Sequence, residues 1–251
     1  MATQSKVMLV TGASRGIGAA VALLAASRGY AVCVNYHRRS DAAGAVVQAI
    51  REQGGEAMAV QADMAREDQI LALFERVQET YGRLDALINN AGVLDLQAKV
   101  EQMSVQRIRR ILDTNVLGVF LCCREAVRRM APRHGGRGGA IVNLSSMAAR
   151  LGSPNEYVDY AASKGAVDTL TVGLAKEVAG DGIRVNAVRP GLIRTDIHAD
   201  CGEPGRVDRL SASIPLQRGG TPEEVAAAVL WLCSDEASYT TGTFIDVSGG
   251  R

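Results

Sequence analysis

The amino-acid sequence predicts an α/β fold, a doubly wound parallel sheet with helices on both faces. Two observations lead to this prediction. Short apolar runs rich in Val, Leu and Ile alternate with longer amphipathic segments along the chain, and such alternation is typical of parallel strands joined by crossover helices. A glycine-rich turn also follows the first apolar run and opens the first helical segment.

The elements are expected to alternate from end to end. Seven apolar runs have the length and composition of buried parallel strands, at residues 6–10, 30–36, 56–60, 84–89, 140–145, 183–188 and 243–247. Amphipathic segments predict helices at about 16–28, 41–53, 66–81, 104–131, 156–179 and 222–234. Because no Pro- or Ser-rich linker and no internal repeat interrupts this order, one domain is expected over residues 1–251.

Composition argues against several classes of partner. The chain has 28 basic and 27 acidic residues, a formal net charge of +1, which gives no field to attract nucleic acid or an anionic membrane. The longest apolar stretch, 19–27, is too short to span a bilayer. The five cysteines lack CxxC spacing and the three histidines are scattered. We therefore expect reduced thiols, no metal site and a cytoplasmic location.

The glycine-rich turn TGASRGIG (11–18) is a candidate phosphate-binding loop. Gly12, Gly16 and Gly18 would let the backbone turn tightly and approach a pyrophosphate. The helix that follows would offer free N–H groups and a favourable dipole. Three glycines after a strand can also form only a tight turn, but the strand before them and the helix after them favour a dinucleotide site.

The end of the second strand predicts which dinucleotide is bound. Sites for NAD place an Asp or Glu there to hold the ribose 2′-hydroxyl group. Here residues 35–39 read NYHRR, and no acid occurs before Asp41. Arg15 in the glycine loop and Arg38 could instead reach a 2′-phosphate, which suits the planar guanidinium group. Arg38 and Arg39 could also be solvated loop charges, but the missing acid favours NADP(H) over NAD(H).

Six short motifs occur in a fixed order along the chain: TGASRGIG, NNAG (89–92), DTNVLG (113–118), NLSS (143–146), YAASK (160–164) and RPG (189–191). Together they resemble the short-chain dehydrogenase/reductase family, most closely its 3-oxoacyl-carrier-protein reductases and bacterial glucose dehydrogenases. The resemblance continues to DVSGG (246–250). It implies a single Rossmann-type domain with seven parallel strands, a substrate lid at about 192–215, a homotetramer, and NAD(P)-linked interconversion of alcohols and carbonyls.

The resemblance also implies a catalytic group of Asn115, Ser146, Tyr160 and Lys164. A tyrosine with its ordinary pKa near 10 is a poor acid or base at neutral pH. A neighbouring lysine ammonium and an oxidised nicotinamide would stabilise the phenolate and lower that pKa. Ser146 would orient the carbonyl oxygen of the substrate, and Asn115 would hold a water that relays protons by way of Lys164.

Cofactor contacts are implied at many positions. Asp63 would contact the adenine ring, and the stretch from Pro190 to Thr195 would hold the nicotinamide. In other contexts Asp63 reads as a helix N-cap and Thr195 as a turn residue. The full set is Gly12, Ser14, Arg15, Gly16, Ile17, Gly18, Asn35, Tyr36, His37, Arg38, Asp63, Met64, Asn90, Ala91, Gly92, Tyr160, Lys164, Pro190, Gly191, Ile193 and Thr195.

Two tyrosines precede the lysine of YAASK. On a helix rising about 1.5 Å per residue, Tyr160 lies about 6 Å from Lys164 along the axis and Tyr157 about 10.5 Å. Only Tyr160 is close enough to be the acid/base, and Tyr157 is either a packing residue or a wall of the substrate pocket. Ser146 precedes Tyr160 by 14 residues, one more than in the relatives that the motifs resemble, and the extra residue is expected in the loop at 151–156. Ser145 is adjacent, so the choice of Ser146 rests on the NLSS motif.

Two further readings concern partners. A carrier-protein thioester would need a basic docking surface near the substrate, and a cluster of arginines is a candidate: Arg124, Arg128, Arg129, Arg133 and Arg137. These cations could equally complement a helix dipole.

A scaffold or sensor that binds NADP(H) without turnover is the alternative to an enzyme, but such a protein would be expected to lose Tyr160 or Lys164. Cys201 reads as an incidental residue of the lid.

Overall fold

A parallel sheet of seven strands, in the order β3-β2-β1-β4-β5-β6-β7, forms the centre of the molecule. The computed structural model describes residues 5–251. Every pair of neighbouring strands is parallel, which confirms the predicted fold class. The strands are β1 (Val7–Val10), β2 (Ala31–Tyr36), β3 (Ala57–Gln61), β4 (Ala86–Asn89), β5 (Gly139–Leu144), β6 (Ile183–Pro190) and β7 (Phe244–Val247).

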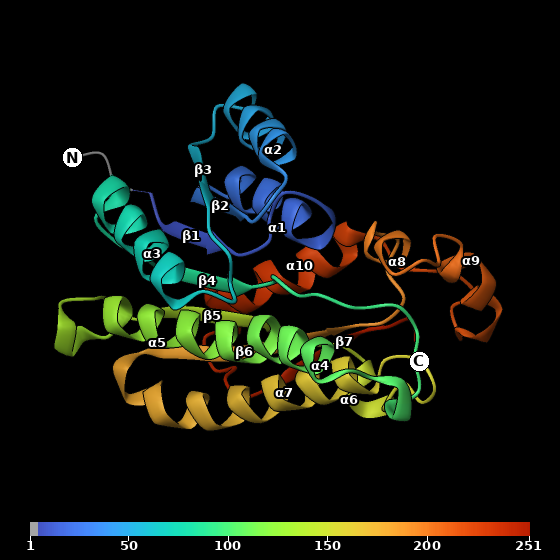
Figure 1. Cartoon of the computed structure of the whole chain (residues 1–251). Coiled ribbons are helices and arrows are strands. Elements are labelled where there is room, and N and C mark those ends of the chain that lie inside the picture. Colours follow the sequence, from blue (N-terminus) through green and yellow to red (C-terminus); the bar gives the residue numbers. More distant parts are fainter. Residues whose placement is uncertain (1–4) are drawn as a thin grey trace.

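Helices connect the strands and cover both faces of the sheet. They are α1 (Gly16–Ser27), α2 (Ser40–Glu52), α3 (Glu67–Tyr81), α4 (Val105–Leu112), α5 (Gly118–Met130), α6 (Ala148–Leu151), α7 (Val158–Val178), α8 (Ile197–Asp200), α9 (Arg206–Leu210) and α10 (Pro222–Cys233). In Figure 1, α1, α2 and α10 lie on one face of the sheet, whereas α3, α5 and α7 lie on the other.

Alternate residues of each strand supply the two halves of the core. Met8 and Val10 belong to the cluster packed against α1, α2 and α10, whereas Val7 and Leu9 belong to the cluster under α3, α5 and α7. Successive side chains of a strand point to opposite faces. Because both faces are covered, the strands are mostly apolar and do not alternate regularly with polar residues.

The expected helix at 104–131 is interrupted. A π-helical turn over Asp113–Leu117 separates α4 from α5, and it contains Asn115. Single π turns inside helices frequently occur at functional sites. The expected lid region contains α8 and α9, which the hydrophobic pattern did not predict. Among the described residues, no helix is long and apolar enough to cross a membrane.

The loops that follow the strands bring the candidate site together. All seven strands run in the same direction, so their carboxyl ends share one edge of the sheet. The strand order reverses between β1 and β4, and open α/β sheets bind ligands outside the strand ends at such a switch point. The motifs TGAS, NNAG, SSM and GLI follow β1, β4, β5 and β6 directly, so they meet at this edge.

Candidate active site

The glycine loop crosses closely over the loop that follows β4. Gly12 has a φ of +61°, and a Cβ atom there would lie 2.9 Å from the Cα of Ala91. A Cβ on Gly18 would lie 2.5 Å from the side-chain nitrogen of Asn90. Contacts this short exclude any side chain. The glycines are therefore required by the crossing of two loops, and they leave open backbone at the N-terminus of α1, where a pyrophosphate would bind.

Asn90 and Thr11 join these two loops. The Asn90 Nδ2 donates to the carbonyl oxygens of Thr11 and Gly12, both at 2.9 Å. The backbone N–H of Ala91 donates to the Thr11 hydroxyl at 3.0 Å. Thr11 was not among the predicted site residues, although its place directly before the glycine loop could have indicated it. These hydrogen bonds hold the glycine loop against the loop after β4 in the candidate cofactor site.

Asn35 supports the glycine loop from behind. Its Oδ1 accepts a hydrogen bond from the N–H of Gly12 at 3.1 Å, and its Nδ2 donates to the carbonyl oxygen of Ala62 at 3.1 Å. The side chain is only 1% exposed. Asn35 therefore supports the glycine loop through both ends of its amide group, and its contact with a cofactor stays a prediction.

Two predicted cofactor residues direct their side chains into the core. Met64 is buried next to the Cys122 thiol, with the two sulfur atoms 3.7 Å apart, and Ile193 is buried in the cluster under α1 and α10. Any contact they make with a cofactor must therefore come from their backbone. Ser14, Ile17 and Tyr36 are half-buried near the strand ends, as expected for a site that a ligand covers.

Asp63 forms a turn after β3. Its Oδ1 accepts from the N–H of Ala65 at 3.0 Å, and its Oδ2 lies 3.6 Å from the Nε2 of His37. It is not the N-cap of α3, because that helix begins four residues later at Glu67. The alternative reading of Asp63 as a helix cap is wrong, and the carboxylate remains beside the end of β2.

Arg15 and Arg39 lie close together near the end of β2, whereas the expected contact of Arg38 with a 2′-phosphate stays a prediction. Arg15 and Arg39 both approach Asp200 of α8, and Arg15 also lies 3.4 Å from Asp196. Arg38 is exposed. The guanidinium groups of Arg15 and Arg39 therefore lie near the end of β2, but both already form ion pairs with acids of the lid region.

Tyr160 and Lys164 lie one turn apart at the start of α7. Lys164 is 4% exposed, and its Nζ donates to the carbonyl oxygen of Leu144 at 2.6 Å. The same Nζ lies 5.6 Å from the centre of the Tyr160 ring. The Tyr160 side chain is hydrogen-bonded to that of Ser146. Ser145 instead donates its hydroxyl to the backbone of α7 at 3.3 Å, so Ser146 is the serine that faces the tyrosine.

Burial controls the protonation of this pair. It raises the pKa of Tyr160 to about 12, against the hydrogen bond from Ser146, which lowers it. It lowers the pKa of Lys164 to about 8, against the charge of Asp168, which raises it. Lys164 was expected to lower the pKa of Tyr160, but burial has the larger effect and raises this pKa. At neutral pH Tyr160 carries its proton and Lys164 is mostly a cation.

Asn115 is fully buried beside Lys164. Its Oδ1 accepts from the N–H of Val93 at 2.8 Å, and its Nδ2 donates to the Val93 carbonyl at 3.0 Å and to Ser163 at 3.2 Å. A Cβ on Gly92 would lie 3.6 Å from both Asn115 Oδ1 and Lys164 Nζ. Asn115 thus ties the loop after β4 to α7, and its role in holding a water stays a prediction.

Pro190, Gly191 and Thr195 complete the site from the end of β6. A Cβ on Gly191 would lie 2.8 Å from the Cα of Ser248. One on Gly16 would lie 3.3 Å from the Thr195 methyl group. The stretch after β6 is therefore packed between the C-terminal segment and the glycine loop. Its contact with a nicotinamide stays a prediction.

Comparison with known proteins decides the family. A family model described as enoyl-(acyl carrier protein) reductase matches residues 12–251. The chain is 60% identical over 245 residues to the uncharacterized oxidoreductase YgfF of Escherichia coli K12, covering 98% of this chain and 99% of the relative. The chain belongs to the short-chain dehydrogenase/reductase family.

Other relatives agree with the resemblance that the motifs indicated. The 3-oxoacyl-[acyl-carrier-protein] reductase FabG of Staphylococcus aureus is 41% identical, with 98% of each chain covered. Glucose 1-dehydrogenase 2 of Bacillus subtilis is 38% identical, with coverage of 98% of this chain and 94% of the relative. A short-chain dehydrogenase from Burkholderia cenocepacia in complex with NADP has a TM-score of 0.90 at 35% identity, with 98% of each chain covered.

The loop at 151–156, where the extra residue of this short-chain dehydrogenase/reductase is expected, precedes α7. Ser153 and Asn155 have φ values of 45° and 63°, a left-handed conformation that Asn tolerates better than Ser. Tyr157 ends the loop and is only 4% exposed. Its ring lies 5.2 Å from the guanidinium carbon of Arg206 in the lid region. Tyr157 is therefore a buried contact between this loop and the lid region.

Arg206 links the lid region to the loop that precedes α7. It is buried and bonds Glu156 at 3.1 Å and Glu203 at 2.8 Å. Arg107 on α4 forms a second buried pair with Asp159 at 2.6 Å, and Asp159 also accepts from the N–H of Tyr160 at 2.9 Å. These ionic contacts were not predicted, because Arg107 and Asp159, like Arg206 and Glu156, lie far apart in the sequence.

A buried amide chain was also missed. Asn89 donates to Asn143 at 2.9 Å, and Asn143 donates to the Thr171 hydroxyl at 2.9 Å. The chain joins β4, β5 and α7 beneath the candidate site. Asparagines inside otherwise apolar strands were the available signal, because buried amides must find hydrogen-bond partners.

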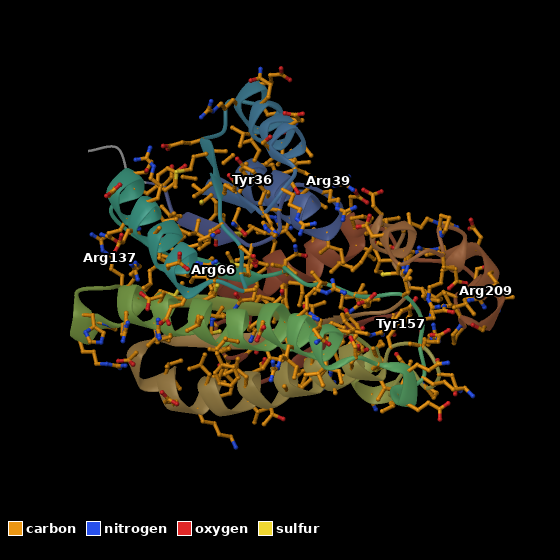
Figure 2. The ribbon with its side chains drawn as sticks, viewed as in Figure 1. Tyr36, Arg39, Arg66, Arg137, Tyr157 and Arg209 are labelled. Atoms are coloured by element: carbon orange, nitrogen blue, oxygen red, sulfur yellow. The ribbon has the colours of Figure 1, made fainter. Side chains whose placement is uncertain are left out.

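The arginine cluster does not lie near the candidate site. Arg137 lies at the opposite end of the molecule from Tyr157 in Figure 2. Several of these arginines also have acidic partners: Arg129 bonds Glu125 at 2.7 Å, and Arg133 pairs with Asp181. The expected docking surface beside the substrate is therefore corrected, because α5 runs back along the sheet and ends at the far edge.

The cysteines take no part in the site. All five thiols are free and buried. Cys201 lies in the lid region, where burial raises the pKa of its thiol to about 11, so it is a poor nucleophile at neutral pH. Within residues 5–251, no group of three or more His, Cys, Asp or Glu side chains is placed to hold a metal ion.

Proposed function

We propose that this protein is an NADP(H)-dependent oxidoreductase that interconverts a carbonyl and an alcohol. The observation that carries the proposal is the arrangement of Tyr160, Ser146 and Lys164. The Tyr160 hydroxyl is bonded to Ser146 at the end of β5, while a buried lysine lies one helical turn further along α7. A protonated phenol beside a second hydroxyl and a buried cation suits proton transfer to a developing alkoxide.

The residues of the chain divide this work. The bound cofactor supplies the hydride in reduction and accepts it in oxidation. Ser146 donates a hydrogen bond to the carbonyl oxygen of the substrate and orients it toward Tyr160. Tyr160, protonated at neutral pH because its pKa is about 12, gives its proton to that oxygen. The ammonium of Lys164 stabilises the phenolate that remains.

The cofactor proposal rests on the ends of β1 and β2. Gly12, Gly16 and Gly18 let the glycine loop pack directly against Asn90, Ala91 and Thr195, which leaves the N-terminus of α1 open to a pyrophosphate. At the end of β2, Arg38 and Arg39 stand where an NAD site would have an acid. The NADP complex of the Burkholderia cenocepacia relative supports this choice. We therefore propose NADP(H) over NAD(H).

A coupled experiment tests both parts. Purified protein is mixed with NADPH or NADH and a panel of small ketones and aldehydes, and the loss of absorbance at the nicotinamide band is followed. Turnover with NADPH that disappears in Tyr160→Phe supports the proposal. Binding of NADPH without turnover across the panel would support the alternative, a cofactor-binding scaffold or sensor.

A carrier-protein thioester remains the second candidate substrate, because FabG of Staphylococcus aureus is 41% identical over nearly the whole chain. The arginine cluster at the far edge of the sheet gives it no support. The test compares a 3-oxoacyl group carried by an acyl-carrier protein with the same group on a small thiol. A higher kcat/KM for the carrier-bound form would favour a carrier substrate, and equal values would favour a small molecule.

We also propose that the protein is a homotetramer. Leu117 and Phe120 lie on the outer side of the helices at 113–130, and each is 48% exposed. Next to them a groove between α5 and α7 is lined by Phe120, Leu170 and Leu174. In the C-terminal segment, Tyr239 is fully exposed. Exposed apolar patches of this kind mark surfaces that bind other proteins.

A further inference from the structure

Asp200 of α8 forms ion pairs with the arginines that would bind a 2′-phosphate. Its carboxylate pairs with Arg15, and its Oδ1 lies 3.7 Å from the Nη2 of Arg39. Asp196 adds a second carboxylate 3.4 Å from the Nη1 of Arg15. Figure 2 labels Arg39, the residue that precedes α2. Asp200 lies 185 residues from Arg15 in the sequence, so only the fold brings them together.

The carboxylates of Asp196 and Asp200 resemble a 2′-phosphate in charge. A phosphate monoester carries about −1.5 to −2 charges at neutral pH and accepts hydrogen bonds through three oxygens. Asp196 and Asp200 together present two negative charges to the same arginines. A 2′-phosphate that bonds Arg15 and Arg39 must therefore displace these carboxylates, because like charges this close repel.

We propose that Asp200, with help from Asp196, is a specificity-determining residue that competes with the cofactor's 2′-phosphate and latches the lid region to Arg15 and Arg39. This inference rests on the proposed preference for NADP(H). A cofactor with the phosphate releases α8 from Arg15 and Arg39, whereas a cofactor without it leaves this contact in place. The other end of the lid region stays joined to Glu156 through Arg206, whichever cofactor binds.

The strength of the contact fits a latch that can open. The side chains of Arg15 and Arg39 are 32% and 54% exposed, and that of Asp200 is 43% exposed. Ion pairs at this exposure are weak and are screened by salt. Bonds from arginine to phosphate are charge-assisted and often bidentate, so the 2′-phosphate displaces the carboxylate of Asp200. The competition should lower the affinity for a 2′-phosphate about two- to fivefold rather than prevent binding.

The test uses two probes that differ only in the 2′-phosphate, adenosine 2′,5′-bisphosphate and 5′-AMP, with affinities measured by calorimetry at low salt. Asp200→Asn should bind the bisphosphate about two- to fivefold more tightly than the wild type, with 5′-AMP unchanged. Asp208→Asn is the matched control. Asp208 is an exposed acid of the same lid region that pairs with Arg194 at 2.7 Å, and its replacement should change neither affinity.

The outcomes separate the latch from the cofactor preference. If Arg15→Ala weakens binding of the bisphosphate while Asp200→Asn fails to strengthen it, the latch is overturned and the NADP(H) proposal stands. If Arg15→Ala and Arg39→Ala both leave bisphosphate binding unchanged, the phosphate site itself is wrong and both proposals fall. Tighter binding in Asp200→Asn that disappears at high salt supports the latch.

Discussion

Lys164 on α7 donates a hydrogen bond of 2.6 Å to the carbonyl oxygen of Leu144, the last residue of β5. Ser146 follows two residues after Leu144, so this bond joins the helix that carries Tyr160 to the loop that carries its hydroxyl partner. The bond also fixes the lysine in a buried position, and this burial lowers its pKa to about 8.

Replacing Tyr160 with Phe should lower kcat for NADPH-linked carbonyl reduction by about 10²–10⁴, because that is the usual contribution of a general acid. NADPH affinity should change little, since the ring remains. Tyr157→Phe is the matched control: it removes one hydroxyl from a buried tyrosine on the same helix start, and kcat should stay within a few-fold of the wild type. Equal losses in both variants would contradict the assignment of Tyr160.

Carbonyl reduction should weaken as the pH rises above about 8. The pKa of Lys164 lies near 8, so its ammonium is present below that pH and lost above it. Tyr160, with a pKa of about 12, keeps its proton over this range and does not set the limit. The check is a profile of kcat/KM against pH, and Lys164→Arg should abolish the decline because its cation persists. A flat wild-type profile from pH 7 to 10 would contradict the role of Lys164.

Arg107→Met should lower the free energy of unfolding by about 3–5 kcal/mol, because it leaves the carboxylate of Asp159 buried without its partner. Asp159 is 3% exposed in its side chain and also accepts from the N–H of Tyr160. Urea denaturation measures the loss. Arg66→Met breaks an exposed pair with Asp68 and should cost less than about 1 kcal/mol. Similar losses of unfolding free energy in the two variants would contradict a larger stabilising role for the buried Arg107–Asp159 pair.

Gly18→Ala should weaken NADPH binding and destabilise the fold by about 1–3 kcal/mol, because its Cβ would lie 2.6 Å from the Gly12 carbonyl oxygen. Gly44→Ala is the control. Gly44 lies in α2 with nothing within 4 Å of its Cβ position, so alanine should stabilise the helix by up to about 1 kcal/mol. Calorimetry and thermal unfolding check both. Normal NADPH affinity in Gly18→Ala would contradict the loop crossing as the reason for this glycine.

Phe120→Asp should break the proposed tetramer into smaller species, because it places a charge in the groove between α5 and α7. Sedimentation velocity at micromolar concentration measures the change. Leu96→Asp adds the same charge at a more exposed residue outside this groove, 60% exposed, and should leave the assembly intact. A wild-type protein that sediments as a monomer would defeat the tetramer proposal.

Much of the fold was predictable because its signals are local. The seven strands were found within one or two residues, since each is a short apolar run between polar turns. The break between α4 and α5 was not, because a π turn changes the bonding of a helix without changing its hydrophobic pattern. The small helices α8 and α9 were also missed, since they are too short to show periodicity.

In the candidate site, too, features that depend on nearby residues were predictable and contacts between distant segments were not. The sequence by itself determined that Tyr160 and Lys164 share a helix face, and that glycines follow β1, because helix pitch and backbone freedom depend on nearby residues. Only the tertiary structure decided that Asn35 stands behind the glycine loop, and that Asp200 reaches Arg15. These contacts join segments far apart in the chain. The burial that sets the pKa of Tyr160 likewise exists only once strands and helices have packed, because desolvation depends on every neighbour at once.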